Sequence, residues 1–257
     1  ISSGYSLKSK YSDLFLADNN LNNPEVILSI NYDGLKSQTY GGTTFLVHAA
    51  VGGSMAPADF GIGGGWGGLR VTKNFVNRFT DTNDKRGNFY TQGQSLEIND
   101  LGDFKNGYAF IKYKNMTSAG VKGSDGSGTF VDADIPLYRL ADVYLMYAEA
   151  TLRGGNGSLS TALGYINALK TRAGAATISS GDLTLNFILD ERSRELSWEF
   201  TRRTDLIRFG LFTSSTYLWP WKGGVKDGKG VEDFRNLFPI PANDIVANRN
   251  LVQNPGY

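Results

Sequence analysis

The segment 191–210 alternates acidic and basic side chains, and its carboxylates are the first candidates for chemistry in this chain. Two carboxylates that converge on a glycosidic bond can act as the acid and the base of a hydrolase. Here, however, each acid has an arginine three or four residues away: Asp190, just before the segment, has Arg194, and Glu199 has Arg202 and Arg203. Such pairing keeps a carboxylate ionised, whereas a general acid needs a raised pKa. We therefore interpret this segment as structural.

Aromatic side chains in a glycine-rich region are the second candidates. Trp66 lies in the run 63–68, and Tyr40, Phe45 and Phe60 precede it. Sugars present apolar C–H faces ringed by hydroxyl groups, and rigid aromatic rings can bind such faces at a low entropic cost. The alternative is that Trp66 is a buried anchor of its own loop. The residues predicted to bind a glycan are Trp66, Tyr40, Phe45, Phe60 and His48.

Other motifs need no chemistry to explain them. His48 is the only histidine, and without a Gly-x-Ser-x-Gly elbow it suggests no Ser-His-Asp triad. The glycines of 63–68 match a dinucleotide-binding pattern in letters alone, because no strand precedes them. Asp81-x-Asn83 and Asp132-x-Asp134 resemble parts of calcium loops, but turn chemistry accounts for both. Neither a metal nor a cofactor is predicted. Three tryptophans are interpreted as packing residues: Trp198, Trp219 and Trp221.

The composition excludes several classes of function. The chain has 257 residues, with 26 basic and 25 acidic side chains and a net charge of +1, so no strong attraction to nucleic acid is expected. It has no cysteine, which excludes disulfides and a thiol nucleophile. No stretch approaches the ~20 apolar residues of a membrane-spanning helix, and no secretory h-region is present at its start. The 32 glycines indicate many turns and long loops.

The elements that must position these side chains form a mainly helical chain with small β-hairpins and long irregular loops. Apolar periodicity predicts helices at 137–153, 160–173 and 184–202, and a shorter one at 204–209. Helical character is also predicted at 11–17 and 71–79, a strand at 25–30 and hairpins within 88–131. The region 31–68 is expected to be irregular, and the tail 217–257 to be mostly extended.

Several stretches, in order along the chain, resemble the RagB/SusD family of nutrient-binding lipoproteins from the outer membrane of Bacteroidetes-type bacteria. Segment 191–210 follows the family pattern ERxxELxxExxRxxDLxRxG. A looser match is NPEVILSI at 23–30, and Lys170 stands where the family usually has Arg. The remaining matches are YRLADVYLMYAEA at 138–150, INALKTRAG at 166–174, PIP at 239–241 and QNPGY at 253–257.

The resemblance implies the C-terminal domain of the SusD-like α/α fold over residues 1–257. Within it we expect a loop- and hairpin-rich, ligand-facing part at 1–135, a helical core at 136–210 and an extended tail at 211–257. Family members are about twice as long and begin with a signal peptide and a lipidated cysteine. The chain is therefore expected to be the C-terminal half of a surface-exposed outer-membrane lipoprotein, whose anchor lies outside these residues.

The function implied by the resemblance is non-catalytic capture of oligosaccharides or polysaccharides. The expected partners are a glycan, a SusC-like TonB-dependent transporter and the N-terminal half of the same protein. Three alternatives stay open. The ligand could be a peptide or another nutrient, the chain could be a surface glycoside hydrolase, or its aromatic residues could contact only protein partners.

Overall fold

Residues 4–257, described by a computed structural model, are mainly helical, as the sequence predicts. Seven α-helices and four short strands make up their regular structure, apart from short 3₁₀ turns. The chain divides after Phe200 into two compact units, and the second comprises Thr201–Tyr257. Within the described residues, every helix is too short or too polar to cross a membrane.

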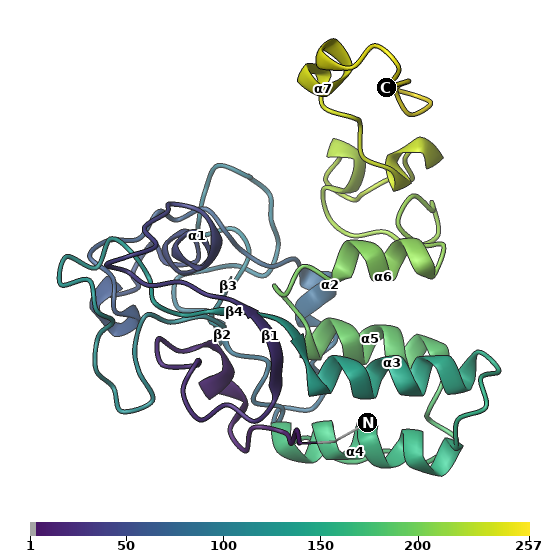
Figure 1. Ribbon diagram of the computed structural model, residues 1–257, viewed down its shortest axis with the longest axis horizontal. Helices are drawn as coiled ribbons and strands as arrows, with labels where there is room; N and C mark the ends of the chain where they lie inside the picture. The colour runs from purple at the N-terminus through teal and green to yellow at the C-terminus, as the bar shows by residue number, and fades with distance from the viewer. Residues whose placement is uncertain (1–3) are drawn as a thin grey trace. The chain divides into compact units, whose positions relative to one another are not determined.

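Three helices of the first unit lie side by side (Figure 1), and their side chains share an apolar core. They are α3 (Leu140–Leu152), α4 (Leu159–Ala173) and α5 (Leu185–Glu195). The side chains of Ile166 and Ile188 are fully buried, in agreement with the apolar stripes of the sequence. Burial of each such side chain contributes roughly 1.5–3 kcal/mol to folding.

Local signals set the ends of these helices. Ser158 accepts a hydrogen bond from the Thr161 amide at the start of α4, and Thr184 accepts one from the Phe187 amide at the start of α5. The helix α4 ends at Gly174, whose φ of +79° lies in the left-handed region that glycine adopts without strain. The predicted boundaries of α4 are therefore confirmed to within one residue.

Two pairs of short antiparallel strands connect distant parts of the first unit. β1 (Val26–Ile30) pairs with β4 (Ile135–Arg139), and β2 (Phe89–Tyr90) pairs with β3 (Ala109–Phe110). The prediction of a helix from Leu137 is wrong at its start, because Leu137 lies in β4 and the helix α3 begins at Leu140. Pairing with β1 keeps this part of the chain extended.

The glycine-rich region is more regular than the sequence predicts. It contains α1 (Gly42–Ala49) and a 3₁₀ turn at Pro57–Phe60, so the expectation of an irregular segment over 31–68 is wrong there. A second apolar core lies beneath it, formed by the loops around α1, β2 and β3. Its fully buried members include Leu14, Phe15 and Ala109.

Two predicted helices are present in shortened form. The stretch 71–79 contains α2 (Lys73–Val76), and 11–17 contains a 3₁₀ turn at Tyr11–Phe15. The helical conformation covers only the middle of the first stretch and only the start of the second.

The chain leaves the helical conformation after α5. The predicted helix 184–202 is wrong beyond Glu195, because Trp198 and Phe200 have φ angles of +58° and +64°. The Trp198 ring packs edge-on against Phe110 at 5.3 Å, and Lys112 donates to the Ser197 carbonyl. Burial of the tryptophan against the second core thus takes precedence over continuation of the helix.

The second unit contains short helices and turns. It begins with α6 (Arg202–Arg208) and includes α7 (Ala242–Ala247), with 3₁₀ turns at Lys222–Gly224 and Asp233–Asn236. The sequence grouped the helix 204–209 with the helical core, whereas the structure places α6 in this unit. The prediction of a mostly extended tail misses the later turns and α7.

Candidate functional site

The carboxylates of the charged segment lie in a buried network of ion pairs. Glu195 accepts hydrogen bonds from Arg139 at 2.6 Å, from Arg86 at 2.9 Å and from Arg172. Burial alone would raise the pKa of Glu195, but the three guanidinium groups outweigh it and hold the pKa far below its usual range. Glu195 therefore stays ionised and is unsuited to general-acid catalysis.

The same network has equal numbers of acidic and basic groups. Glu199 accepts hydrogen bonds from Arg139 Nε at 2.7 Å and from Lys112 Nζ at 2.6 Å. Burial lowers the pKa of Lys112 to about 8, although Glu199 opposes this shift. The ion pairs connect five carboxylates with five cations: Glu25, Asp84, Glu191, Glu195 and Glu199 with Arg86, Lys112, Arg139, Arg172 and Arg194.

The partners of these carboxylates differ from those predicted by local spacing. Asp190 pairs with Arg78 at 2.9 Å and not with Arg194. Glu199 pairs with residues from β4 and the loop after β3 and not with Arg202 or Arg203, the two arginines next in the sequence. The end of α5 explains the second correction, because helical spacing no longer applies between 196 and 200. The structural interpretation of the segment holds, but its pairing is mostly long-range.

Three of the five predicted ligand-binding residues meet on the surface of the first unit. The rings of Tyr40 and Phe45 lie 6.4 Å and 6.2 Å from the ring of Trp66, between centroids. Their exposed fractions are 65% for Tyr40, 44% for Phe45 and 46% for Trp66. We call Tyr40, Phe45 and Trp66 the aromatic platform. The alternative of a buried loop anchor does not describe Trp66.

A helix and the loop that caps it position the platform. Phe45 is the exposed residue of α1, whose other side chains pack against the core. The Trp66 amide donates to the His48 carbonyl at 2.8 Å, and the Leu69 amide donates to the Ala49 carbonyl at 2.7 Å. The glycine-rich loop thus satisfies carbonyl groups that the end of a helix leaves without partners. This loop brings Trp66 beside Phe45.

Glycine is required in this loop by a close approach of two backbone segments. A Cβ atom at Gly65 would lie 2.3 Å from the Val51 carbonyl oxygen, whereas one at Gly64 would meet nothing within 4 Å. The loop follows a 3₁₀ turn and not a strand, which distinguishes it from a dinucleotide-binding motif.

His48 lies beneath Trp66 and not on the surface. Its side chain is only 4% exposed, and its ring stacks on the Trp66 ring with centroids 4.8 Å apart and an interplanar angle of 25°. Its Nδ1 is 2.6 Å from the Gly64 carbonyl oxygen, so this nitrogen carries the proton and donates. The structure therefore gives His48 a supporting contact with the platform.

Phe60 does not join the platform. It belongs to the apolar core and is 6% exposed, and the Lys114 ammonium lies 5.0 Å from its ring centroid. The sequence placed Phe60 with the other aromatic residues because it lies in the same glycine-rich region. Its position in the 3₁₀ turn Pro57–Phe60 directs it inward.

Phe130 is a neighbour of the platform that sequence reasoning missed. Its ring lies 5.2 Å from the Tyr40 ring, and it is half-buried. The Asp125 carboxylate accepts hydrogen bonds from the amides of Ser127, Thr129 and Phe130, and the Phe130 amide has the largest part in lowering the pKa of Asp125. The turn sequence Ser124–Ser127 was a visible signal, but its contact with residue 40 was not.

The two calcium-like fragments serve as turn-closing groups. Asp81 accepts hydrogen bonds from the amides of Asn83 and Ala176, and Asp132 accepts them from the amides of Gly34 and Ser124. Within residues 4–257, no cluster of three or more His, Cys, Asp or Glu side chains has an arrangement that could hold a metal ion.

Comparison with known proteins defines the family to which this chain belongs. The SusD family model matches residues 89–257, and the chain belongs to the SusD family. It is 33% identical over 306 residues to the starch-binding protein SusD of Bacteroides thetaiotaomicron, covering 100% of this chain and 54% of that protein. It is 30% identical over 275 residues to SusD-like protein P2 of Formosa agariphila, covering 98% and 52%. The chain thus spans about half the length of the curated relatives it matches.

Solved structures agree with this assignment. Surface glycan-binding protein A from Bacteroides thetaiotaomicron, in complex with laminarihexaose, is 25% identical with a TM-score of 0.70, over 98% of this chain and 56% of that one. Surface glycan-binding protein A from Bacteroides fluxus has a TM-score of 0.72 at 20% identity, over 100% and 56%, and supports the fold alone.

Proposed function

We propose that this chain captures oligosaccharides on the aromatic platform without altering them chemically. The observation that carries the proposal is the cluster of three exposed rings on a fixed base, with Trp66 at its centre. Such rings bind the C–H faces of sugars, and polar groups around them bind the hydroxyl edges. Because stacking uses no net charge, the affinity is expected to change little with salt.

The relatives support this class of ligand. One curated relative is named a starch-binding protein, and a structural neighbour at 25% identity was solved with laminarihexaose. Starch and laminarihexaose are both neutral and are both built from glucose. We therefore take neutral glucans as the first ligands to test on this chain.

The electrostatics favour binding over hydrolysis. The carboxylates of the buried network are neutralised by cations, and the pKa values of Glu191 and Glu195 are lowered. Asp134 is different, because burial raises its pKa, but the residue is only 2% exposed and cannot reach a bound sugar. A glycosidase needs two accessible carboxyl groups at a set separation.

Family membership supports a proposal for the cellular role. We propose that the protein acts at the outer-membrane surface as a lipoprotein and passes its glycan to a SusC-like TonB-dependent transporter. Since the curated relatives are about twice as long, we also propose that an N-terminal half of the same protein completes the ligand site.

Substitution of Trp66 by alanine tests the proposal. We expect Trp66→Ala to weaken binding of maltohexaose or laminarihexaose by about 2 kcal/mol, or roughly 30-fold, because a central tryptophan carries much of the energy of such a contact. The melting temperature should change little, since the ring is half-exposed. Isothermal titration calorimetry and a thermal melt measure the two quantities.

The matched control is Tyr138→Ala, which removes an aromatic ring that is 53% exposed on β4, outside the platform. Glycan affinity should be unchanged in this variant. Undiminished binding in Trp66→Ala would contradict the site. Binding of a peptide digest without binding of any glycan would replace the glycan with a peptide, and release of reducing sugar would establish hydrolysis.

A further inference from the structure

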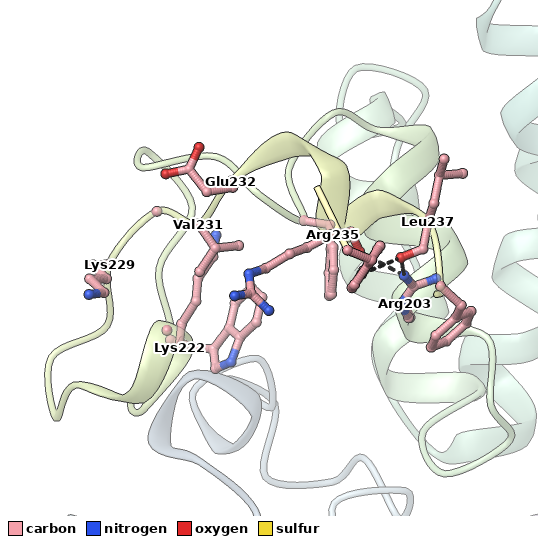
Figure 2. Close-up of a pocket in the computed structure, with 13 residues that line it drawn as sticks. Arg203, Lys222, Lys229, Val231, Glu232, Arg235 and Leu237 are labelled. Carbon is pink, nitrogen blue, oxygen red and sulfur yellow. Dashed lines mark hydrogen bonds between the residues drawn. The ribbon is translucent and has the colours of Figure 1, made fainter. Parts of the chain in front are cut away.

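The second unit contains a pocket of about 640 Å³ that the proposed function does not use (Figure 2). Cavities of a few hundred to a thousand cubic ångströms are typical of small-molecule sites. Its walls combine basic and aromatic side chains, notably Arg203, Lys222, Lys229, Arg235, Trp219 and Phe238.

The positive charge of this pocket is not neutralised. Four lining residues are basic and one, Glu232, is acidic. Across residues 4–257, no carboxylate lies within ion-pair distance of any of the four bases. A concave surface with an excess of one sign of charge concentrates counter-ions.

Two of the four cations hold the pocket together. The Lys222 ammonium, in a residue only 3% exposed, donates to the carbonyl oxygens of Ser214 at 2.5 Å and Tyr217 at 2.8 Å. Arg203 donates to the carbonyl oxygens of Arg235 and Asn236 at 2.8 Å and 3.1 Å. Carbonyl groups bind these cations without cancelling their charge.

The other two cations are available to a ligand. The side-chain nitrogens of Arg235 and Lys229 form no hydrogen bond or ion pair with any residue that the structure describes. Figure 2 shows Arg235 extending across the pocket toward Val231 and Lys222, with the Glu232 carboxylate directed elsewhere. A guanidinium in this position can bind a carboxylate or sulfate through two parallel hydrogen bonds.

Aromatic rings with exposed faces lie beside the basic side chains of the pocket. The Arg203 guanidinium lies 3.8 Å from the Phe238 ring centroid and covers one face, yet Phe238 is 68% exposed. Tyr257 donates from its hydroxyl to the Leu237 carbonyl at 2.8 Å, which fixes a second ring at the pocket. A sugar ring that carries a carboxylate or sulfate could therefore stack on an aromatic ring and pair with a basic side chain at the same time.

We propose that this pocket binds an acidic sugar, with its carboxylate or sulfate on Arg235 and an apolar sugar face against a lining aromatic ring, while Lys229 on the far side of the pocket adds positive charge. The site lies in the second unit, whereas the residues of the aromatic platform belong to the first. It would extend the ligands of this protein from neutral glycans to uronic-acid or sulfated ones.

Calorimetry on the 257-residue chain tests this site with three probes: trigalacturonic acid, a neocarrabiose sulfate disaccharide and neutral maltotriose. In Trp66→Ala, which removes the centre of the platform, we expect one or both charged probes to bind more tightly than maltotriose, and to bind more weakly as salt is raised. Arg235→Gln should weaken the charged probe at least about tenfold, because a charge-assisted hydrogen-bond pair is lost. Lys229→Gln, an independent exposed change, should weaken it in the same direction.

Lys226→Gln is the matched control, since Lys226 is an exposed lysine of the same loop outside the pocket lining, and it should bind the charged probe normally. Trp66→Ala should also bind it normally, which separates this site from the platform. The proposal is overturned if neither charged probe binds Trp66→Ala better than maltotriose does, or if both Gln variants bind the charged probes like the parent chain.

Discussion

At the scale of single residues, Glu195 shows how much depends on a buried charge. Three arginines surround its carboxylate, and no part of its side chain is exposed. Loss of one member of a buried ion-pair network leaves its partners desolvated without compensation. The same carboxylate on the surface would contribute little.

Glu195→Gln should therefore lower the free energy of unfolding by about 3–5 kcal/mol. The control is Glu97→Gln, which removes the carboxylate from an exposed pair with Lys73 and should change stability by less than about 1 kcal/mol. Urea denaturation, monitored by circular dichroism, measures both. Equal effects of the two substitutions would show that the buried network is not stabilising.

Residue types predicted which rings to consider, but not where each ring points. Tyr40, Phe45 and Trp66 share an exposed surface, whereas Phe60, from the same glycine-rich region, is buried. The difference arises from α1 and the following 3₁₀ turn, which set the direction of each side chain. Phe130 was missed because its contact with Tyr40 spans 90 residues.

At the scale of elements, the aromatic platform depends on how the glycine-rich loop closes α1. The backbone of the loop runs so close to Val51 that a methyl group at Gly65 has no room. The neighbouring Gly64 has open space around the same position. These adjacent glycines offer a direct test of the contact.

Gly65→Ala should lower stability by about 1–3 kcal/mol through this overlap, and should weaken glycan binding because Trp66 is displaced. Gly64→Ala should change stability and binding little. Thermal melts and calorimetry on both variants provide the measurements. If Gly65→Ala binds and melts like the parent chain, the loop is not held as described.

The helices were largely predictable, and the break after α5 was not. The periodicity of α4, its Ser158 cap and its Gly174 end are local signals that the sequence displays. The left-handed residues Trp198 and Phe200 are poor candidates for such a conformation by residue type alone. Contacts with Phe110 and Lys112, more than 80 residues away, accompany this conformation.

At the scale of the whole molecule, the buried network of ion pairs makes the stability of the fold depend on pH in the acid range. The pKa values of Glu191 and Glu195 are lowered from an ordinary value of 4.5 in the folded state. Below about pH 4.5 the unfolded chain therefore binds more protons than the folded one, and protonation favours unfolding. The stabilisation is fully present above that pH and is lost progressively as the pH falls further.

Glu191 and Glu195 should leave the melting temperature nearly unchanged between pH 7 and pH 5. Below about pH 4.5 the melting temperature should fall as these carboxylates become protonated. Glu195→Gln, which removes one of the two shifted groups, should reduce the pH dependence in that acid range. A melting temperature that stays constant down to pH 3 would contradict the ion-pair description.

The fold class and the family motifs were readable from the sequence, whereas the grouping of elements was not. The expected boundary at residue 211 differs from the division after Phe200, so the helix α6 belongs with the residues that follow it. Helical periodicity identifies α6 but does not indicate its neighbours. The pocket of the second unit likewise depends on turns that residue type did not predict.

The ion-pair network also sets an order of events during synthesis. Tyr11 donates to the Glu195 carbonyl across 184 residues, and Glu25 pairs with Arg139 and Arg172. The ribosome adds about 5–20 residues per second, so the first of these groups wait roughly 10–40 s for their last partners. Contacts of such long range slow folding, and during this interval the early segments are candidates for binding by chaperones.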